Sequence, residues 1–510
     1  MNFETIKNKI LLRNEEKKFI QLNKKKFKIS KKGKYIILEI NNNYFTLVHY
    51  AYLLNDIKFK NNQFVGLWTP CIPREKGLLN LFKFFLKFLI FKIEKKKWDK
   101  LYSSIGIKKV VSINDNFKTN FLNYRDSFLK KNLKISSKKN YLNLKFKNIL
   151  VGELMYDFYL RYFKKYTINF DDRYEIIKIA NYVSSFVKNL NQLISDLGLK
   201  NIDKYIPWQA AYIQCGIPIR FFLNKKVKVI GKSQEVFSKK YTQRDFFQSM
   251  FFEDLKKNFA KFKNKKFKLK QSLNSLRSRY RGKINPELNY LLTSPFRKSN
   301  LKISKNIDVI IFLPDFVDAP HSSGGVFVFA DFYDWIIETI NFLNKFKNLN
   351  VAIKPHPNSR FTSRIFEEKL KKTYPNFIWL ERTISNHSIF KKKPSVGISP
   401  RGSVLFDLAY HGICPVAIGR NPCMAYSFVK TAFTKKQYFS FMNKGIKKKL
   451  KLPKNYKKQV VECYFMNFIN KPEYFETISS KINLKNYRNA TTKENIHMVQ
   501  MYNENYFKKN

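Results

Sequence analysis

The sequence predicts an α/β protein with two lobes, each built on a largely parallel sheet, and three observations lead to this fold class. From residue 307 onward, short apolar segments alternate with helical segments, the order typical of a doubly wound parallel sheet. A similar alternation begins at Tyr44 and ends near residue 230. At 510 residues, the chain is also too long for one compact core.

Changes in composition divide the chain into four parts. Residues 1–235 form the predicted first lobe, and residues 236–300 are a strongly basic, helical connector without an obvious strand. Residues 301–450 form the second lobe, and residues 451–510 a polar, mostly helical C-terminal segment. Two α/β lobes joined by a connector place a ligand between them, at the carboxyl ends of the strands.

Each lobe's elements follow from its apolar pattern. In the first lobe we expect an edge strand at 35–40, strands at 45–49, 63–68, 110–113 and 226–230, and helices over 149–197 and 206–222. In the second lobe we expect about five strands and three helices. The strands are at 307–313, 351–353, 377–380, 395–398 and 415–418, and the helices at 331–345, near 363–373 and from Ser403. The segment 307–313 is almost wholly apolar, as in a strand buried on both faces.

The chain is very basic, with 98 Lys and Arg against 37 Asp and Glu and a formal net charge of +61. The excess is mostly Lys spread along the whole chain, together with 50 Phe, which is the bias of an A- and T-rich genome acting on permissive surface positions. Attraction to an anionic membrane or an acidic polymer is the alternative. Because no single basic stripe stands out, we do not expect a nucleic-acid partner.

Cysteine usage and hydropathy indicate the compartment. Five scattered cysteines form neither a CxxC pair nor a metal-ligand spacing, as expected in a reducing compartment. No apolar run of about 18 residues exists to span a membrane. Residues 78–93 are apolar but carry three Lys, so they are either a helix packed on a sheet or an interfacial helix. We therefore expect a cytoplasmic protein with possible peripheral association with the inner membrane.

Two prolines enclose a histidine directly after the apolar segment 351–353, in the sequence Lys354-Pro355-His356-Pro357. Proline restricts the backbone, so the imidazole is held in one direction at the edge of the sheet. Lys354 and His356 can both donate to phosphate oxygens. The motif predicts a phosphate-binding loop, and an incidental histidine in a proline-rich turn is the structural alternative.

A second motif, Arg401-Gly402-Ser403, stands where the segment 395–398 runs into a helix. Gly402 allows a ligand close to the backbone, and Ser403 is a natural helix N-cap, so the helix start predicts a phosphate cradle. Asp407, one turn further on, is expected to accept from ribose hydroxyls, with an ordinary helix carboxylate as the alternative. His411 is expected to be a helix C-cap rather than a catalyst.

Two further features complete the predicted site. The loop from Asp315 to Gly325 follows the first strand of the second lobe, and His321, Ser323 and Gly324 are its candidate phosphate-binding residues. A base for an acceptor hydroxyl should come from the opposite lobe, where His49 is the candidate. No DxD pair indicates a metal, so neither a metal nor another cofactor is expected, and cations and the helix dipole would neutralise the leaving group.

At these residues the chain resembles the capsule polysaccharide synthesis family of glycosyltransferase-like proteins. The resemblance covers roughly residues 305–440 and rests on the segment 354–358, on Gly402-Ser403 and on Gly412-Ile413-Cys414-Pro415. It implies two Rossmann-like lobes of GT-B type, and phosphate contacts from His356 and Ser403 to a CMP-linked donor. Such transferases commonly have Glu where this chain has Asp407.

The resemblance implies a function in bacterial surface-polysaccharide assembly. The second lobe would bind a nucleotide-activated sugar, with a CMP-linked sugar as one candidate, and the first lobe a glycan or lipid-linked acceptor. The segment 403–409 is also similar to teichoic-acid polyol-phosphate transferases, which use CDP-glycerol or CDP-ribitol, so that activity is an alternative. A catalytically inactive scaffold of polysaccharide assembly is the other alternative.

Overall fold

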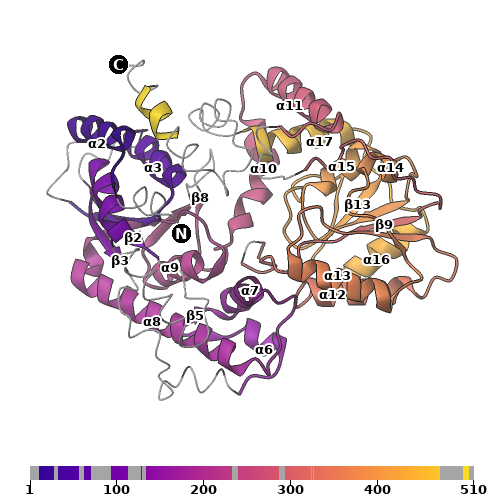
Figure 1. The fold of residues 1–510 in the computed structure, drawn as a ribbon, viewed down its shortest axis with the longest axis horizontal. Coiled ribbons are helices and arrows are strands. Elements are labelled where there is room, and N and C mark those ends of the chain that lie inside the picture. The colour runs from indigo at the N-terminus through magenta and orange to yellow at the C-terminus, as the bar shows by residue number, and fades with distance from the viewer. Residues whose placement is uncertain are drawn as a thin grey trace.

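The computed structural model confirms the predicted fold class, with two six-stranded sheets, each largely parallel, in two Rossmann-like lobes (Figure 1). It describes residues 11–27, 33–56, 62–69, 93–112, 128, 132, 134–231, 239–285, 293–322, 324–325, 327–470 and 498–504. The predicted apolar helix at 78–93 lies almost wholly outside these residues, as does Ser323.

The sheet of the first lobe has the strand order β3-β2-β1-β6-β7-β8. All neighbouring pairs are parallel except β7 and β8. The strands are β1 (Tyr35–Ile40), β2 (Gln63–Trp68), β3 (Ile107–Ser112), β6 (Ile202–Ile206), β7 (Lys228–Gly231) and β8 (Lys239–Lys240). Apolar side chains cover both faces of β1: Ile36, Leu38 and Ile40 enter one core and Ile37 the other.

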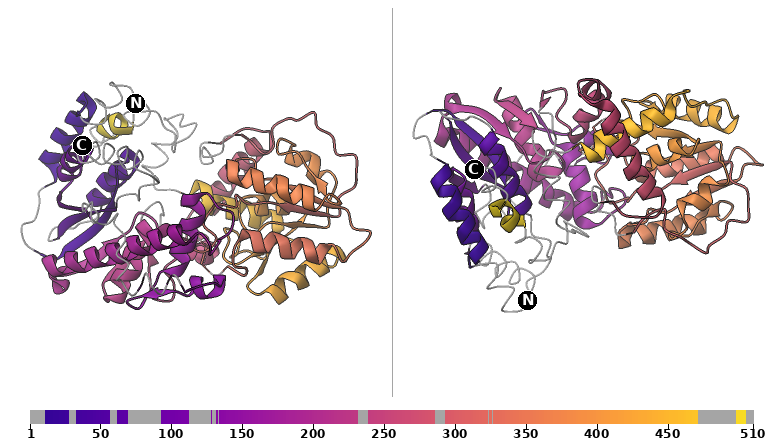
Figure 2. Two further views of the ribbon diagram at one scale, coloured as in Figure 1. Left: turned by 60° about the horizontal axis from the view of Figure 1, so that its bottom comes forward. Right: turned by 90° about the horizontal axis from the view of Figure 1, so that it is seen from above.

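Helices cover both faces of this sheet. They are α2 (Asn14–Lys26), α3 (Tyr44–Asp56), α6 (Lys138–Leu142), α7 (Gly152–Phe163), α8 (Arg173–Leu197) and α9 (Tyr212–Asn224), with a short hairpin of β4 (Lys145–Phe146) and β5 (Ile149–Leu150) and a 3-10 turn η2 (Leu199–Asn201). Helices α7, α8 and α9 pack in one core, and α2 and α3 in the other. The helical residues 498–504 join this second core, and Figure 2 shows them beside α2.

Two predictions for the first lobe are wrong. The segment 45–49 is part of the helix α3 and not a strand. Short apolar runs have the same composition in buried strands and buried helices, so periodicity cannot separate them. The segment 35–40 is a strand, but a central one rather than an edge, because β1 pairs with both β2 and β6. The strand β6 at 202–206 lies within a region that the sequence did not assign.

The sheet of the second lobe has the order β11-β10-β9-β12-β13-β14, and its neighbouring pairs are all parallel. The strands are β9 (Val309–Phe312), β10 (Val351–Lys354), β11 (Ile378–Trp379), β12 (Val396–Ile398), β13 (Cys414–Ile418) and β14 (Lys430–Ala432). The helices are α12 (Phe332–Leu343), α13 (Phe361–Thr373), α14 (Asn386–Phe390), α15 (Val404–Tyr410) and α16 (Lys435–Ile446). The sixth strand, β14, is short and polar, and the apolar pattern did not reveal it.

The connector is mostly helical, as predicted, but it also contributes β8 to the first sheet. Its helical parts are η3 (Gln248–Asp254), α10 (Leu255–Ala260) and α11 (Lys265–Tyr280). Beyond the second sheet follow α17 (Tyr456–Tyr464) and a π-helical turn η5 (Phe465–Ile469). Helices α10, α11, α15 and α17 share one apolar core, so the connector packs on the second lobe. Among the described residues, no helix is long and apolar enough to cross a membrane.

Candidate functional site

The topology of each sheet places one crevice at the carboxyl ends of its strands. In the second sheet, β10 and β11 lie on one side of β9, and β12, β13 and β14 lie on the other. In the first sheet, β2 and β3 lie on one side of β1, and β6 to β8 on the other. Open α/β sheets bind ligands at such switch points. The candidate site of the second lobe is therefore the carboxyl edge shared by β9, β10 and β12.

The carboxyl edges of the two sheets face each other. Tyr212 begins α9, shortly after β6 ends, and its backbone N–H donates to Ser322 Oγ at 3.1 Å. Its hydroxyl donates to Asp318 Oδ1 at 3.2 Å. Asp318 and Ser322 both belong to the loop that follows β9. Tyr212 has a φ of 63°, a strained conformation for a bulky residue, and such strain is often found at functional sites.

His356 of the histidine–proline loop is positioned as a hydrogen-bond donor. Its Nδ1 accepts from the backbone N–H of Asn358 at 3.2 Å, so the neutral ring carries its proton on Nε2. Burial lowers the pKa of His356 to about 4, although Asp318 opposes this shift, so the imidazole is neutral at pH 7. Arg382 fixes the loop by donating to the carbonyl of His356 and to Ser359 Oγ.

Lys354 lies in the same motif but is held inside the lobe. Its ammonium donates to the carbonyl of Ile384 at 2.8 Å and to Asn386 Oδ1, and the residue is 3% exposed. Burial lowers the pKa of Lys354 to about 7, against the attraction of Asp407. The phosphate contact predicted for Lys354 stays a prediction. In this structure, its hydrogen bonds instead tie β10 to the start of α14.

Gly402 and Ser403 form the turn between β12 and α15. Gly402 has a φ of 113°, and no described atom lies within 4 Å of the position that a Cβ would take there. Ser403 is partly exposed, and among the described residues its side chain makes no capping bond to α15. The strands β10 and β12 flank β9, so the strands that lead into the histidine–proline loop and into this turn are roughly 10 Å apart. A ligand could approach both groups at one edge.

Arg401 has a different place from its two neighbours. Its guanidinium donates to the carbonyls of Ala319 and Pro320 and lies 5.2 Å from the ring centre of Phe327. A Cβ on Gly324 would lie 2.0 Å from the Arg401 guanidinium, so a larger residue at this position would require Arg401 to move. Burial lowers the pKa of Arg401 to about 10. Arg401 and Gly324 thus fix the loop after β9, and their predicted phosphate contacts stay predictions.

Asp407 is paired with a residue of the connector. Arg279 of α11 donates to both carboxylate oxygens, from Nε at 3.1 Å and from Nη2 at 2.7 Å, and both side chains are buried. Burial lowers the pKa of Arg279, but attraction to Asp407 outweighs it and the net shift is upward. The ribose contact predicted for Asp407 remains untested, and this geometry favours a structural role. His411 is the C-cap of α15, as predicted.

The loop after β9 binds a carboxylate of the first lobe. Asp157 of α7 accepts from the backbone N–H groups of His321 and Ser322 and from Ser322 Oγ. Burial raises the pKa of Asp157 to about 7. His321 is buried, its Nε2 lies 2.7 Å from the carbonyl of Ala330, and burial lowers its pKa to about 4. In the loop predicted to bind a phosphate, the backbone N–H groups of His321 and Ser322 therefore hold Asp157 here.

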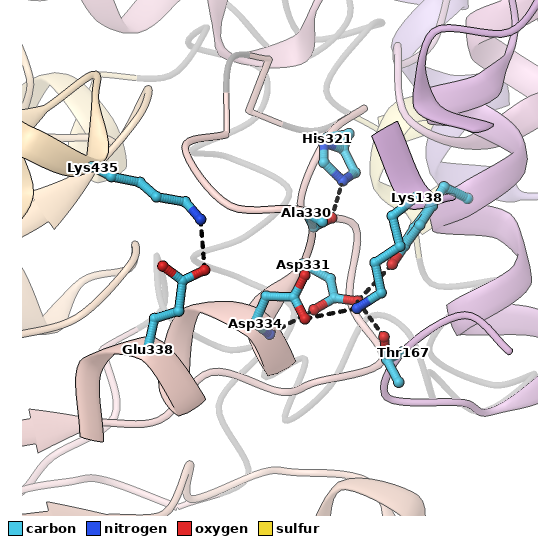
Figure 3. A network of polar contacts seen from close by, with 9 residues as sticks. Lys138, Thr167, His321, Ala330, Asp331, Asp334, Glu338 and Lys435 are labelled. Atoms are coloured by element: carbon cyan, nitrogen blue, oxygen red, sulfur yellow. Dashed lines mark hydrogen bonds and ion pairs between the residues drawn. The ribbon is translucent and has the colours of Figure 1, made fainter. Parts of the chain in front are cut away.

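A second carboxylate joins the lobes at the start of α12 (Figure 3). Asp331 caps this helix by accepting from the backbone N–H of Asp334 at 2.8 Å. It also accepts from Tyr156 and Thr167 hydroxyls and from Lys138 Nζ, all of the first lobe. This network and the Asp157 contacts fix one side of the lobe junction.

His49, the candidate base, lies in α3 and is 2% exposed, with its ring 5.2 Å from that of Trp208. A carboxylate stands close by: Glu39 of β1 accepts from the backbone N–H of Trp208 at 2.8 Å. Burial raises the pKa of Glu39 to about 7. These groups lie near the switch point of the first sheet, but His49 and Glu39 are both buried in the lobe. The role of His49 as a base stays a prediction.

Three residues at the lobe junction are not among the site residues predicted from the sequence. Asp318 has a side chain that is 60% exposed, and Arg161 Nη1 of α7 lies 3.6 Å from its Oδ1. Tyr212 is the third. Asp318 follows a buried strand and was therefore recognisable as an edge residue. Arg161 and Tyr212 lie in helices more than 100 residues away, and no local signal links them to Asp318.

The structure thus separates the predicted site residues into two groups. His356, Gly402 and Ser403 lie partly exposed at the carboxyl edge of the second sheet, with Asp318 nearby. Lys354, Arg401, Asp407 and His321 are engaged by protein groups. Two pockets lie elsewhere. One of about 320 Å³ lies at Arg220, between the first lobe and the start of the connector, and one of about 570 Å³ lies at Lys24 in the first lobe.

Comparisons with known proteins give structural likeness without family membership. No family model matches the chain, and no curated protein matches it, so the resemblance to the capsule polysaccharide synthesis family stays a prediction. A glycosyltransferase from Rickettsia africae is 10% identical with a TM-score of 0.28, and the match covers 94% of this chain and 100% of that one.

Two further solved structures are similar at the same level. The N-terminal domain of Candida albicans trehalose-6-phosphate phosphatase is 8% identical, with a TM-score of 0.28 and coverage of 94% and 98%. Anabaena HepE, in complex with UDP and glucose, is 10% identical, with a TM-score of 0.22 and coverage of 94% and 99%. At these values the likeness concerns the fold alone, and the proposals below rest on the chain's own residues.

Proposed function

We propose that this chain is a glycosyltransferase that uses a nucleotide-activated sugar and acts in the assembly of a bacterial surface polysaccharide. The donor binds at the carboxyl edge of the second sheet, and the glycan or lipid-linked acceptor approaches from the first lobe. The observation that carries this proposal is the pairing of two open groups at one switch point, the His356 imidazole and the Gly402–Ser403 turn.

The donor phosphate is the part of the ligand that these groups fit. His356 offers Nε2–H from a loop that Arg382 fixes. When an anion raises the pKa of His356, the ring gains a positive charge, and the protonated Nδ1 gives up the hydrogen bond from the Asn358 N–H. Ser403 offers a hydroxyl, and Gly402 leaves room for a phosphate against the backbone. Sugar transfer breaks the bond between the anomeric carbon and the leaving phosphate, so donors at that phosphate stabilise the developing charge.

Asp318 is the carboxylate that we propose as general base. Its side chain is 60% exposed and oriented by Tyr212 and Arg161 of the first lobe, where the acceptor would approach. As the acceptor oxygen attacks the anomeric carbon, its proton passes to the Asp318 carboxylate, and the bonding electrons leave with the nucleotide phosphate. This role replaces that of His49 in our proposal, because His49 lies buried within α3.

The test is a thermal-shift and calorimetry panel with CMP, CDP, UDP, GDP and their sugar or glycerol conjugates. One nucleotide should stabilise the protein, and His356→Ala should weaken that binding by about 10- to 100-fold, the loss of one charge-assisted hydrogen bond. His411→Ala, at the other end of α15, should retain the binding. If no nucleotide binds to well-folded protein, the proposal fails and the scaffold alternative gains support.

Product analysis separates the proposal from the polyol-phosphate transferase. A sugar transferase leaves a glycosidic bond and releases the nucleotide with its phosphate. The alternative transfers the polyol together with a phosphate and leaves a phosphodiester in the product. Phosphorus NMR of the product from the nucleotide conjugate that binds would distinguish the two, and a phosphodiester signal would refute sugar transfer.

A further inference from the structure

The helical hairpin of α10 and α11, residues 255–283, is a strongly basic part of the described chain that packs on the second lobe. It contains twelve Lys and Arg in 29 residues and no Asp or Glu. Composition alone, at 98 Lys and Arg and 37 Asp and Glu in 510 residues, would give about half that many cations and about two acids. The local charge therefore exceeds the general bias of the chain.

An aromatic side chain stands exposed in the middle of this charge. Phe267, in the first turn of α11, is 69% exposed. Four exposed lysines surround it in sequence on the hairpin tip and the first turns of α11: Lys263, Lys265, Lys266 and Lys270. Burying a Phe side chain is worth about 1.5–3 kcal/mol, so Phe267 would gain that much on entering an apolar environment.

The opposite side of the hairpin packs on the second lobe, so the position of the basic face is fixed. Leu255, Phe259 and Leu276 are buried in the core shared with α15 and α17. Ser272 Oγ donates to the carbonyl of Val461 at 2.7 Å, and Arg279 forms the buried pair with Asp407. Figure 1 shows α11 at the top of the second lobe, on the side toward the first lobe, and the right view of Figure 2 shows it at the edge of the fold.

We propose that this face of the hairpin docks on an anionic lipid bilayer, with the lysines against the headgroups and Phe267 inserted between them. Lysines near an anionic surface and an aromatic side chain at the headgroup level are the two elements of interfacial binding. Single-stranded nucleic acid, the other polyanion, is usually bound by aromatics that line a basic groove, whereas Phe267 stands on a convex helix. The inference does not rest on the proposed transferase activity.

The test is co-sedimentation of the full chain with vesicles of phosphatidylcholine, alone or mixed with phosphatidylglycerol. The protein should sediment with the mixed vesicles and stay in the supernatant with vesicles of phosphatidylcholine alone. Replacing Lys263, Lys265, Lys266 and Lys270 together by Gln should weaken binding by roughly fivefold per lysine, or more than 100-fold overall. Phe267→Ser should weaken it by about tenfold or more. Circular dichroism would verify that each variant is folded.

Matched controls separate this surface from the net charge. Replacing the exposed Lys444, Lys447, Lys448 and Lys449, at the end of α16, removes the same charge elsewhere, and Phe361→Ser removes an aromatic that is 76% exposed on α13. Both controls should keep most of the binding. Equal losses in hairpin and control variants, no binding to anionic vesicles, or hairpin-dependent binding of RNA in place of vesicles would each overturn the proposal.

Discussion

Removing the carboxylate of Asp407 should destabilise the second lobe strongly, because Arg279 would keep its charge in a buried place. The Arg279 side chain is 2% exposed, and Asp407 supplies both of its charge-neutralising contacts, at 3.1 and 2.7 Å. Rings of Phe296 and Phe406 lie 5.3 and 5.6 Å from the guanidinium and cannot replace a counter-charge. Breaking a buried ion pair on one side costs about 3–5 kcal/mol.

The assay compares the urea unfolding of the original chain with that of a single and a double variant. Asp407→Ala should lower the free energy of unfolding by about 3–5 kcal/mol. The double variant Arg279→Met, Asp407→Leu should recover most of that loss, because an apolar pair of similar volume needs no counter-charge. Because α11 belongs to the connector, loss of this ion pair should also weaken the packing of α11 against α15. A cost below about 1 kcal/mol for Asp407→Ala, with nucleotide binding abolished, would refute this reasoning and restore the ribose role.

Three further predictions concern the carboxyl edge of the second sheet. Nucleotide affinity should rise as the pH falls from about 7 to 5, because a bound phosphate raises the pKa of His356 from about 4 and binding takes up a proton. Calorimetry in buffers of different ionisation enthalpy measures that uptake, and uptake unchanged in His356→Gln would place the phosphate elsewhere. Gly402→Ala should cost roughly 1–3 kcal/mol from its φ of 113° alone and weaken nucleotide binding, as urea titration and calorimetry would show; unchanged stability would contradict the strain. Asp318→Asn should lower kcat by about 10²- to 10⁴-fold with donor Kd nearly unchanged, and an unaffected kcat would exclude it as the base.

Much of the second lobe could be predicted from the sequence, because its strands are short apolar runs that stop abruptly at polar residues. The segments around Ile353 and Ile398 are of this kind, and both motifs therefore fell at the correct edge of the sheet. The first lobe was harder. The apolar run that begins at Tyr44 is buried on several sides, and neither its length nor its composition separates a helix from a strand.

The partners of the site residues could not be predicted, because they come from distant parts of the chain. Arg279 precedes Asp407 by 128 residues, and Asp157 precedes Ser322 by 165. A motif indicates which atoms a residue offers to its surroundings, but tertiary packing decides whether a ligand or the protein accepts them. For Arg401 the acceptors are two loop carbonyls of the protein, whereas within the described part of the chain no group accepts from His356 Nε2.

The packing of residues 498–504 on the first lobe has a consequence for the order of folding during synthesis. Tyr502 lies 5.0 Å from the rings of both Phe19 and Tyr52, and its hydroxyl donates to Asn23 Oδ1 at 2.8 Å. The ribosome makes these two sides of one core almost 480 residues apart. The first lobe, although made first, cannot complete its core until the second lobe has been translated, so its apolar surface near α2 needs protection from nascent neighbours for most of that time.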